Sequence, residues 1–297
     1  MLRRSFLESV PLATLLAARA RNVRLGIRTY VYQAHPMAEA ARAIREAGFE
    51  AVHIGLRFAD GRFEMSQPDW EFARRARETF GQANLTIAGI DGYVPLLHPD
   101  PETRKRNVRA LAALLERARE FGTPVVATET GIFRGQSAPG DLEAAWKQLL
   151  AMLRELLKAA EAGDTILAIE PSFSTFIGTV EAVRRMLEEV ASPRLKILWD
   201  AAHLIQAADL ADTGKAMARA VAAFGSHIVL AHANDVRLGA EGKTESCRAG
   251  TGRLDYRAFI SLLGRLGREV ALCIEHAREN EVPETVDYIQ RFLKEAF

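Results

Sequence analysis

The chain has 297 residues, of which 48% are hydrophobic and 26% are charged, and 39 basic against 38 acidic side chains leave a formal net charge of +1. This balance is ordinary for a globular enzyme and gives no electrostatic reason to expect a nucleic acid or an anionic membrane surface as partner. No apolar run reaches the roughly 18 residues that a membrane-spanning helix needs, so we expect no membrane span.

Residues 1–20 resemble an export signal. Residues 3–7 read Arg-Arg-Ser-Phe-Leu, the core of a twin-arginine signal, and a weakly apolar stretch and a small-residue segment follow at 10–16 and 17–20. Glu8 interrupts the region, and the alternative is an amphipathic N-terminal helix of a cytoplasmic protein. The segment therefore predicts export to the periplasm, with a single domain over the remaining residues.

From residue 21 onward, short apolar runs alternate with longer amphipathic segments, which is the pattern of strands and helices in turn. In the first half, the predicted strands cover residues 23–31, 51–55, 85–90 and 124–128. The predicted helices that follow them cover residues 37–47, 68–81, 101–121 and 142–161.

In the second half, four apolar runs each end in a side chain that can bind a metal ion. The predicted strands cover residues 166–170, 197–200, 228–232 and 270–275, and they end in Glu170, Asp200, His232 and Glu275. The predicted helices between and after them cover residues 180–190, 213–224, 256–266 and 283–296. Cys273 shares a strand face with Glu275, so we expect it to point inward, and we expect both it and Cys247 to be free thiols.

Eight strand–helix units fill residues 21–297 without leaving enough chain for a second domain. Continuous apolar strands are typical of a parallel sheet that helices cover on its outer face. The sequence therefore predicts an α/β protein with one (β/α)8 barrel. The competing architecture, a doubly wound open sheet, would not bring four consecutive strand ends together.

Parallel strands of a closed barrel direct their carboxyl ends to one mouth, where active sites of this architecture lie. The four strand-end residues, spaced roughly 30 to 40 positions apart, would meet there. Three carboxylates and an imidazole at one point either repel each other or hold a divalent cation. We therefore predict a metal site made by Glu170, Asp200, His232 and Glu275, with Mn²⁺ or Mg²⁺ preferred and Co²⁺ or Zn²⁺ tolerated because of the histidine.

Short motifs around these ligands resemble those of a known family. Residues 200–203 read D-x-x-H, residues 232–237 read H-x-x-D-x-R, residues 250–255 read G-x-G-x-x-D, and residues 273–275 read Cys-Ile-Glu. Together they resemble the xylose isomerase-like TIM barrel family, which includes ketose 3-epimerases, hydroxypyruvate isomerases, inosose dehydratases and endonuclease IV. The resemblance covers the predicted strands four to eight well and the N-terminal third only in its pattern.

The resemblance implies a sugar isomerase or epimerase in which Glu170 and Glu275 bind the metal and also move protons on opposite faces of the substrate. A divalent cation would stabilise the cis-enediolate that forms when a ketose is deprotonated. The resemblance further implies that His203 hydrogen-bonds a substrate oxygen and that Arg237 anchors an oxyanion or hydroxyl.

Three other residues are candidates for the site. Asp235 is predicted to orient His232 or Arg237. His53, on the second strand, and Glu129, at the end of the fourth, are predicted to line the substrate pocket, although an ordinary structural role is equally compatible with the sequence.

Several functions remain open at this stage. The enediolate could instead expel a hydroxyl group, which would make the protein a dehydratase of a sugar-like or inosose-like ketone. A non-catalytic sugar- or metal-binding protein is a further alternative. A DNA-repair endonuclease is disfavoured, because the histidine that endonuclease IV carries after its strand-seven ligand is missing and the net charge is balanced. We expect a small sugar or ketone as the partner, no nucleic acid, and a homo-oligomer as one option.

Overall fold

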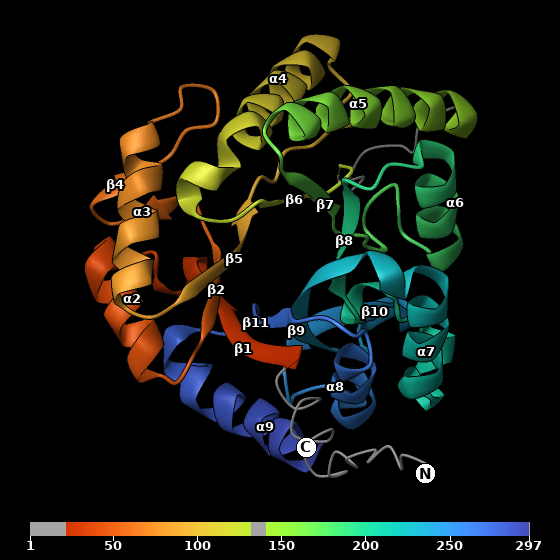
Figure 1. Ribbon diagram of the computed structural model, residues 1–297. Helices are drawn as coiled ribbons and strands as arrows, with labels where there is room; N and C mark the ends of the chain where they lie inside the picture. The colour runs from red at the N-terminus through yellow and green to blue at the C-terminus, as the bar shows by residue number, and fades with distance from the viewer. Residues whose placement is uncertain (1–21, 132–140, 297) are drawn as a thin grey trace, which may run out of the picture.

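The computed structural model describes residues 22–131 and 141–296, and within them the chain forms a closed parallel barrel with helices around its outside (Figure 1). The strands pair in the order β1, β2, β5, β6, β7, β8, β9 and β11, and pairing of β11 with β1 closes the ring. They are β1 (Val23–Arg28), β2 (Ala51–Ile54), β5 (Thr86–Asp91), β6 (Val125–Thr128), β7 (Ile166–Ile169), β8 (Leu195–Asp200), β9 (Ile228–Leu238) and β11 (Val270–Ile274). The predicted (β/α)8 barrel is confirmed.

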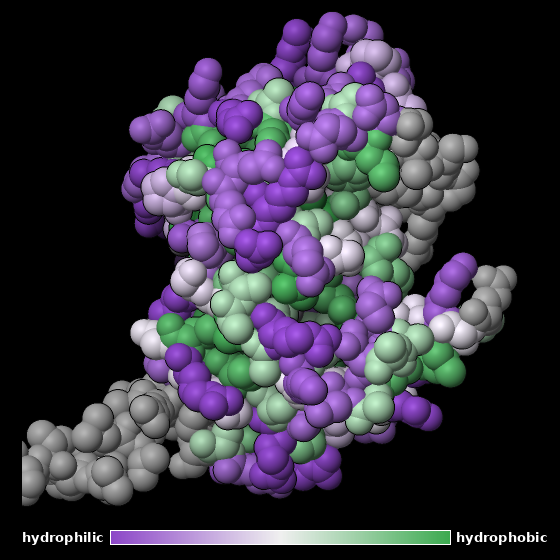
Figure 2. Space-filling view, turned by 90° about the vertical axis from the view of Figure 1, so that its right-hand side faces the viewer, coloured by the Kyte–Doolittle hydropathy of each residue, from purple (hydrophilic) through white to green (hydrophobic). Residues whose placement is uncertain are grey.

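Eight α-helices of the described residues follow these strands and cover the barrel (Figure 1). They are α2 (Met37–Glu46), α3 (Trp70–Gln82), α4 (Pro101–Arg117), α5 (Leu142–Ala162), α6 (Val180–Val190), α7 (Thr213–Phe224), α8 (Tyr256–Gly264) and α9 (Val282–Glu295). Several begin at an aspartate whose side chain accepts hydrogen bonds from the first free N–H groups, as Asp69 and Asp141 do. Figure 2 shows hydrophilic residues spread over one side of the molecule with apolar ones between them, as amphipathic helices on a covered core require.

The alternation of side chains along each strand separates two cores. Small and branched side chains fill the barrel interior: Ala51, Val125, Ala127, Ala168, Leu198, Leu230, Ala271 and Cys273. The intervening residues point outward, and Trp199 packs edge-on against Phe224 and Phe259 beneath the helices. Cys273 and Cys247 are both buried and free, as expected. Because Leu198 and Cys273 point inward, Asp200 and Glu275 two residues later point into the mouth.

The structure differs from the predicted elements in several places. The first strand ends at Arg28, and a 3-10 turn (Thr29–Tyr32) follows where the strand was expected to continue. The predicted helix over 101–121 changes to a 3-10 turn after Arg117. Two short strands, β3 (Arg57–Phe58) and β4 (Gly61–Arg62), form a hairpin in a segment where no strand was expected.

The largest correction concerns β9, which does not end at His232. It continues to Leu238 and pairs antiparallel with β10 (Thr244–Arg248), so a hairpin rises from the mouth of the barrel. His232 therefore lies in the middle of a strand, whereas the other three ligands lie at or one residue after a strand end. The hairpin forms one wall of the cavity described below.

The predicted export signal at residues 1–20 lies outside the described residues. Among the helices that the structure describes, none combines the length and the apolar composition that crossing a membrane requires.

Candidate metal centre

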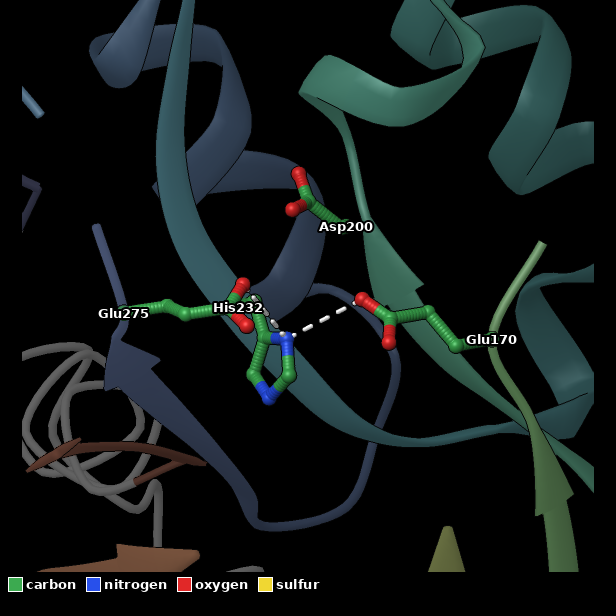
Figure 3. A group of neighbouring side chains, drawn as sticks. All are labelled: Glu170, Asp200, His232 and Glu275. Atoms are coloured by element: carbon green, nitrogen blue, oxygen red, sulfur yellow. Dashed lines mark hydrogen bonds and ion pairs between the residues drawn. The ribbon is translucent and has the colours of Figure 1, made fainter. Parts of the chain in front are cut away.

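The four predicted metal ligands meet at the carboxyl-terminal mouth of the barrel (Figure 3). One ligand atom from each of Glu170, Asp200, His232 and Glu275 lies within 4.8 Å of those of the other three. The four side chains are nearly or fully buried, with exposed fractions between 0% and 6%. Figure 3 shows Glu170 and Glu275 reaching in from opposite sides, with His232 between them.

The imidazole of His232 compensates part of the negative charge. Its Nδ1 lies 3.1 Å from Glu170 Oε1 and 3.3 Å from Glu275 Oε2. Burial alone would lower the pKa of His232, but the two carboxylates raise it to about 10. Burial would likewise raise the pKa of both glutamates, but the neighbouring histidine charge holds each below its ordinary value. Burial dominates at Asp200, whose pKa is raised.

His203 stands on the wall of the same site. Its Nε2 lies 3.3 Å from Asp200 Oδ2, and its Nδ1 lies 3.4 Å from Glu170 Oε1. Burial opposes its charged form, yet the carboxylates of Asp200 and Glu170 raise the pKa of His203 to about 9. The side chain retains 17% of its exposure and lines the cavity, so it can reach a substrate.

His53 does not line the cavity, contrary to the prediction, because it lies fully buried beneath the metal ligands. Its Nδ1 is 2.9 Å from His232 Nε2 in a hydrogen bond, and its Nε2 is 3.1 Å from Asp91 Oδ1 without good hydrogen-bond geometry. Burial lowers the pKa of His53 to about 4, so it is neutral at pH 7. A neutral imidazole in this position can accept a hydrogen bond from His232 Nε2. This contact fixes the ring orientation and the tautomer of His232 and leaves Nδ1 of His232 for a metal ion.

The sequence reading missed three residues that contact the ligands. Arg28 bridges Asp91 and Glu275 from the end of β1. Tyr93 Oη donates a hydrogen bond to Glu170 Oε2 at 2.5 Å, and the amide of Asn234 donates to Asp200 Oδ2 at 2.5 Å and to Glu275 Oε2 at 2.8 Å. Arg28 ends a barrel strand just as Asp200 does, so a search for polar residues at every strand end would have found it.

The two remaining candidates of the H-x-x-D-x-R motif take other places than predicted. Asp235 is buried and orients neither His232 nor Arg237, because its carboxylate accepts hydrogen bonds from the backbone N–H groups of Val236, Gly250 and Leu254. Arg237 lies largely exposed on the hairpin, where its Nε is 2.6 Å from Glu245 Oε1. Asp235 thus holds the loop after β10, and Arg237 forms an ion pair at the rim.

A cavity of about 500 Å³ opens at the mouth of the barrel, and two of the four ligands, Glu170 and Glu275, line it. Glu129, predicted as a pocket residue, lies on its wall. The other lining residues come from the barrel mouth, the loop after β7 and the hairpin strand β10: Arg28, Tyr93, Glu170, Ser172, Phe173, Ser174, His203, Thr244, Glu245, Ser246, Glu275 and His276.

The donor set fits a divalent metal ion. Buried carboxylates are costly unless a cation neutralises them, and three of them converge here with a single imidazole nitrogen. Three hard oxygen donors and one nitrogen suit Mn²⁺ or Mg²⁺ and tolerate Co²⁺ or Zn²⁺. Glu170, Asp200, His232 and Glu275 could therefore hold one ion at the floor of the cavity.

Comparison with known proteins supports the barrel and its family. The family profile described as xylose isomerase-like TIM barrel matches residues 41–296. Comparison with curated protein sequences gives no significant match.

Solved structures with the same fold share little sequence with this chain. An L-ribulose 3-epimerase is 18% identical with a TM-score of 0.70, covering 92% of this chain and 95% of that one. A D-tagatose 3-epimerase-like protein is 16% identical with a TM-score of 0.71, covering 92% and 98%. A xylose isomerase-like TIM barrel protein from Mycobacterium smegmatis in complex with magnesium is 17% identical with a TM-score of 0.68, covering 93% and 98%.

Proposed function

Because the chain belongs to the xylose isomerase-like TIM barrel family, we propose that it is a divalent-metal-dependent isomerase or epimerase of a small sugar or ketose. The observation that carries this proposal is the pair of glutamates, Glu170 and Glu275, which enter one buried site from opposite sides (Figure 3). A substrate carbon held between two carboxylates can lose a proton to one and regain a proton from the other. The likeness to an L-ribulose 3-epimerase structure agrees with this reaction type.

The metal would be held by the four ligands described above. When bound, a divalent cation would polarise the substrate carbonyl and stabilise the negative charge that develops during deprotonation. His203 lines the cavity beside Asp200 and Glu170, so a ring N–H of its imidazole can donate a hydrogen bond to a substrate oxygen. Burial of the ligands strengthens their electrostatic interactions with a bound substrate.

The two glutamates have different surroundings, and this difference supports different roles. Glu275 contacts the guanidinium of Arg28, a permanent positive charge, and also accepts from Asn234. Glu170 accepts from the neutral hydroxyl of Tyr93, and the cationic groups near it are His203 at 3.4 Å and His232 at 3.1 Å, which can lose their charge. A carboxylate beside a permanent cation is the weaker base, so in our proposal Glu170 removes the first proton more readily than Glu275.

The test is solvent exchange at the substrate carbon. Purified protein with added Mn²⁺ would be incubated with a panel of ketoses in deuterated water, and deuterium incorporation would be followed by NMR. Glu170→Gln and Glu275→Gln should each lower exchange by at least about 10²-fold, since each removes a proton-transfer group. Glu188→Gln, on the exposed face of α6, is the matched control and should exchange like the wild type. Undiminished exchange in both site variants would remove the glutamates as acid and base.

Loss of water is the second candidate reaction. One observation favours it, namely that His203 lies on the cavity wall 3.3 Å from Asp200, where its imidazole could protonate a departing hydroxyl group. The same assay separates the two reactions, because a dehydratase forms an unsaturated ketone that absorbs in the ultraviolet. A protein that binds sugar and metal but catalyses neither exchange nor dehydration would be a binding protein instead.

A further inference from the structure

The cavity over the metal ligands has charged groups on its wall, but its guanidinium groups are already paired. Arg28 directs Nε and Nη2 to the carboxylate of Asp91 at 2.9–3.0 Å, and its Nη1 contacts Glu275. All three nitrogens therefore have carboxylate partners. The guanidinium keeps two further N–H groups, but a substrate phosphate or carboxylate that approached them would also meet the two carboxylates that neutralise its charge.

The second guanidinium near the cavity is also occupied. Arg237 lies directly across from Glu245 in the β9–β10 pair, and its Nε is 2.6 Å from Glu245 Oε1. Directly opposed residues of an antiparallel pair point to the same face, so Arg237 stands beside a residue that lines the cavity. Its charge is cancelled there by the carboxylate.

The histidines of the wall are paired in the same way. His203 lies between Asp200 and Glu170, and His276 Nε2 lies 4.0 Å from Glu275 Oε2. Among the lining residues that the structure describes, every Arg and His side chain therefore lies within 4.0 Å of a carboxylate. With a divalent ion bound, the four carboxylates of Glu170, Asp200, Glu275 and Asp91 would balance the charges of the ion and of Arg28, so no excess positive charge would remain for an anionic substituent.

The rest of the wall combines hydroxyl groups with one exposed aromatic ring. Phe173 keeps 37% of its exposure, which is unusual for so apolar a side chain, and it lines the cavity edge-on to His203. Ser174, Thr244 and Ser246 line the same cavity and carry hydroxyl groups. An aromatic ring beside hydrogen-bonding groups matches a molecule that has an apolar C–H face and a hydroxylated edge.

From these pairings we infer that the substrate is an uncharged sugar, and that sugar phosphates and sugar acids are poor substrates because none of the described lining residues offers a cation without a carboxylate neighbour. The inference rests on the proposed function and specifies its substrate class. In a neutral sugar, the C–H face lies against Phe173 and the hydroxyl groups exchange hydrogen bonds with the serine and threonine side chains. Glu245 contributes to the selectivity because it keeps Arg237 from acting as an anion anchor.

The test compares each ketose with its terminal phosphate ester. Ketopentoses and ketohexoses, free and phosphorylated, would be assayed with the Mn²⁺-loaded full chain, measuring kcat/KM for exchange and, separately, the Kd of each sugar by calorimetry. The free sugar should be preferred by at least about 30-fold in kcat/KM. A phosphate ester used as well as its free sugar would overturn the inference while leaving the proposed reaction intact.

A variant tests the pairing itself. Glu245→Gln releases Arg237, so the preference for the free sugar should fall by about 5-fold or more. Glu188→Gln is the matched control, because it releases Arg184 from a similar exposed pair on α6, away from the cavity, and should leave the preference as in the wild type. An unchanged preference in Glu245→Gln would overturn the role given to this pair.

Failure of the proposed function would look different. In that case neither free nor phosphorylated sugars would exchange or dehydrate. Calorimetry would still decide the inference. A phosphorylated sugar that binds more weakly than its free form supports it, and a phosphorylated sugar that binds equally well or more tightly overturns it.

Discussion

Replacing Asp235 should destabilise the protein without removing a metal ligand. Its buried carboxylate accepts hydrogen bonds from Val236 N at 2.8 Å, Leu254 N at 2.7 Å and Gly250 N at 3.0 Å. Gly252 packs so closely that a Cβ there would lie 2.3 Å from Asp235 Oδ1. The carboxylate therefore fixes the loop that leads from β10 into α8.

The magnitude follows from these three bonds. A hydrogen bond to a charged group contributes about 1.5–3 kcal/mol, and a buried donor left without a partner costs about 1–3 kcal/mol. Gly250 is exposed, so in Asp235→Ala its N–H can hydrogen-bond to water. The N–H groups of Val236 and Leu254 are buried and would be left without a partner. We expect that variant to lose about 3–5 kcal/mol of unfolding free energy. Asp235→Asn keeps one acceptor oxygen and should lose about 1–2 kcal/mol.

The assay is urea unfolding of metal-free protein, followed by tryptophan fluorescence, because bound metal would stabilise the folded state on its own account. Asp287→Ala, an exposed position on α9, is the control and should stay within about 0.5 kcal/mol of the wild type. Folded Asp235→Asn should bind one divalent ion like the wild type. Loss of metal binding with unchanged stability would refute this reasoning and restore the predicted role of Asp235 in orienting His232.

Three further predictions concern the metal and the N-terminus. Wild-type protein should hold close to one divalent ion per chain by elemental analysis. Asp200→Asn should lose this ion, because the variant removes one of the buried anionic ligands. An Asp200→Asn protein that holds as much metal as the wild type would contradict the assignment. The metal-free site protonates His232, whose pKa is raised to about 10, so metal uptake must displace this proton and the apparent affinity should rise about tenfold per pH unit between pH 6 and 8. Calorimetry in buffers of different ionisation enthalpy would count the released proton, and no release would argue against His232 as a ligand. Replacing Arg3 and Arg4 by Lys should block export to the periplasm, and cell fractionation showing the same compartment for both forms would reject the signal.

The sequence by itself determined the alternation of strands and helices and four of the residues that meet at the mouth. Both are local properties. Apolar periodicity identifies a helix or a strand, and a polar residue at the carboxyl end of a buried strand indicates a position at the mouth of the barrel. Helices α6 and α7 begin and end where the pattern predicts. The inward direction of Cys273 followed from the same period-two alternation as that of Glu275.

Only the tertiary structure decided what surrounds those ligands. Arg28 and Asp91 end strands β1 and β5, which are not neighbours in the sheet, and they meet because the closed barrel directs their side chains to one centre. His53 points inward as Ala51 does, yet its depth below the mouth depends on the register of β2 against β5, which shifts next to it. Continuation of β9 beyond His232 likewise required a partner strand, β10, whose pairing the local pattern did not reveal. Strand register and hydrogen-bond partners are set between segments distant in the chain, so periodicity within one segment carries no information about them.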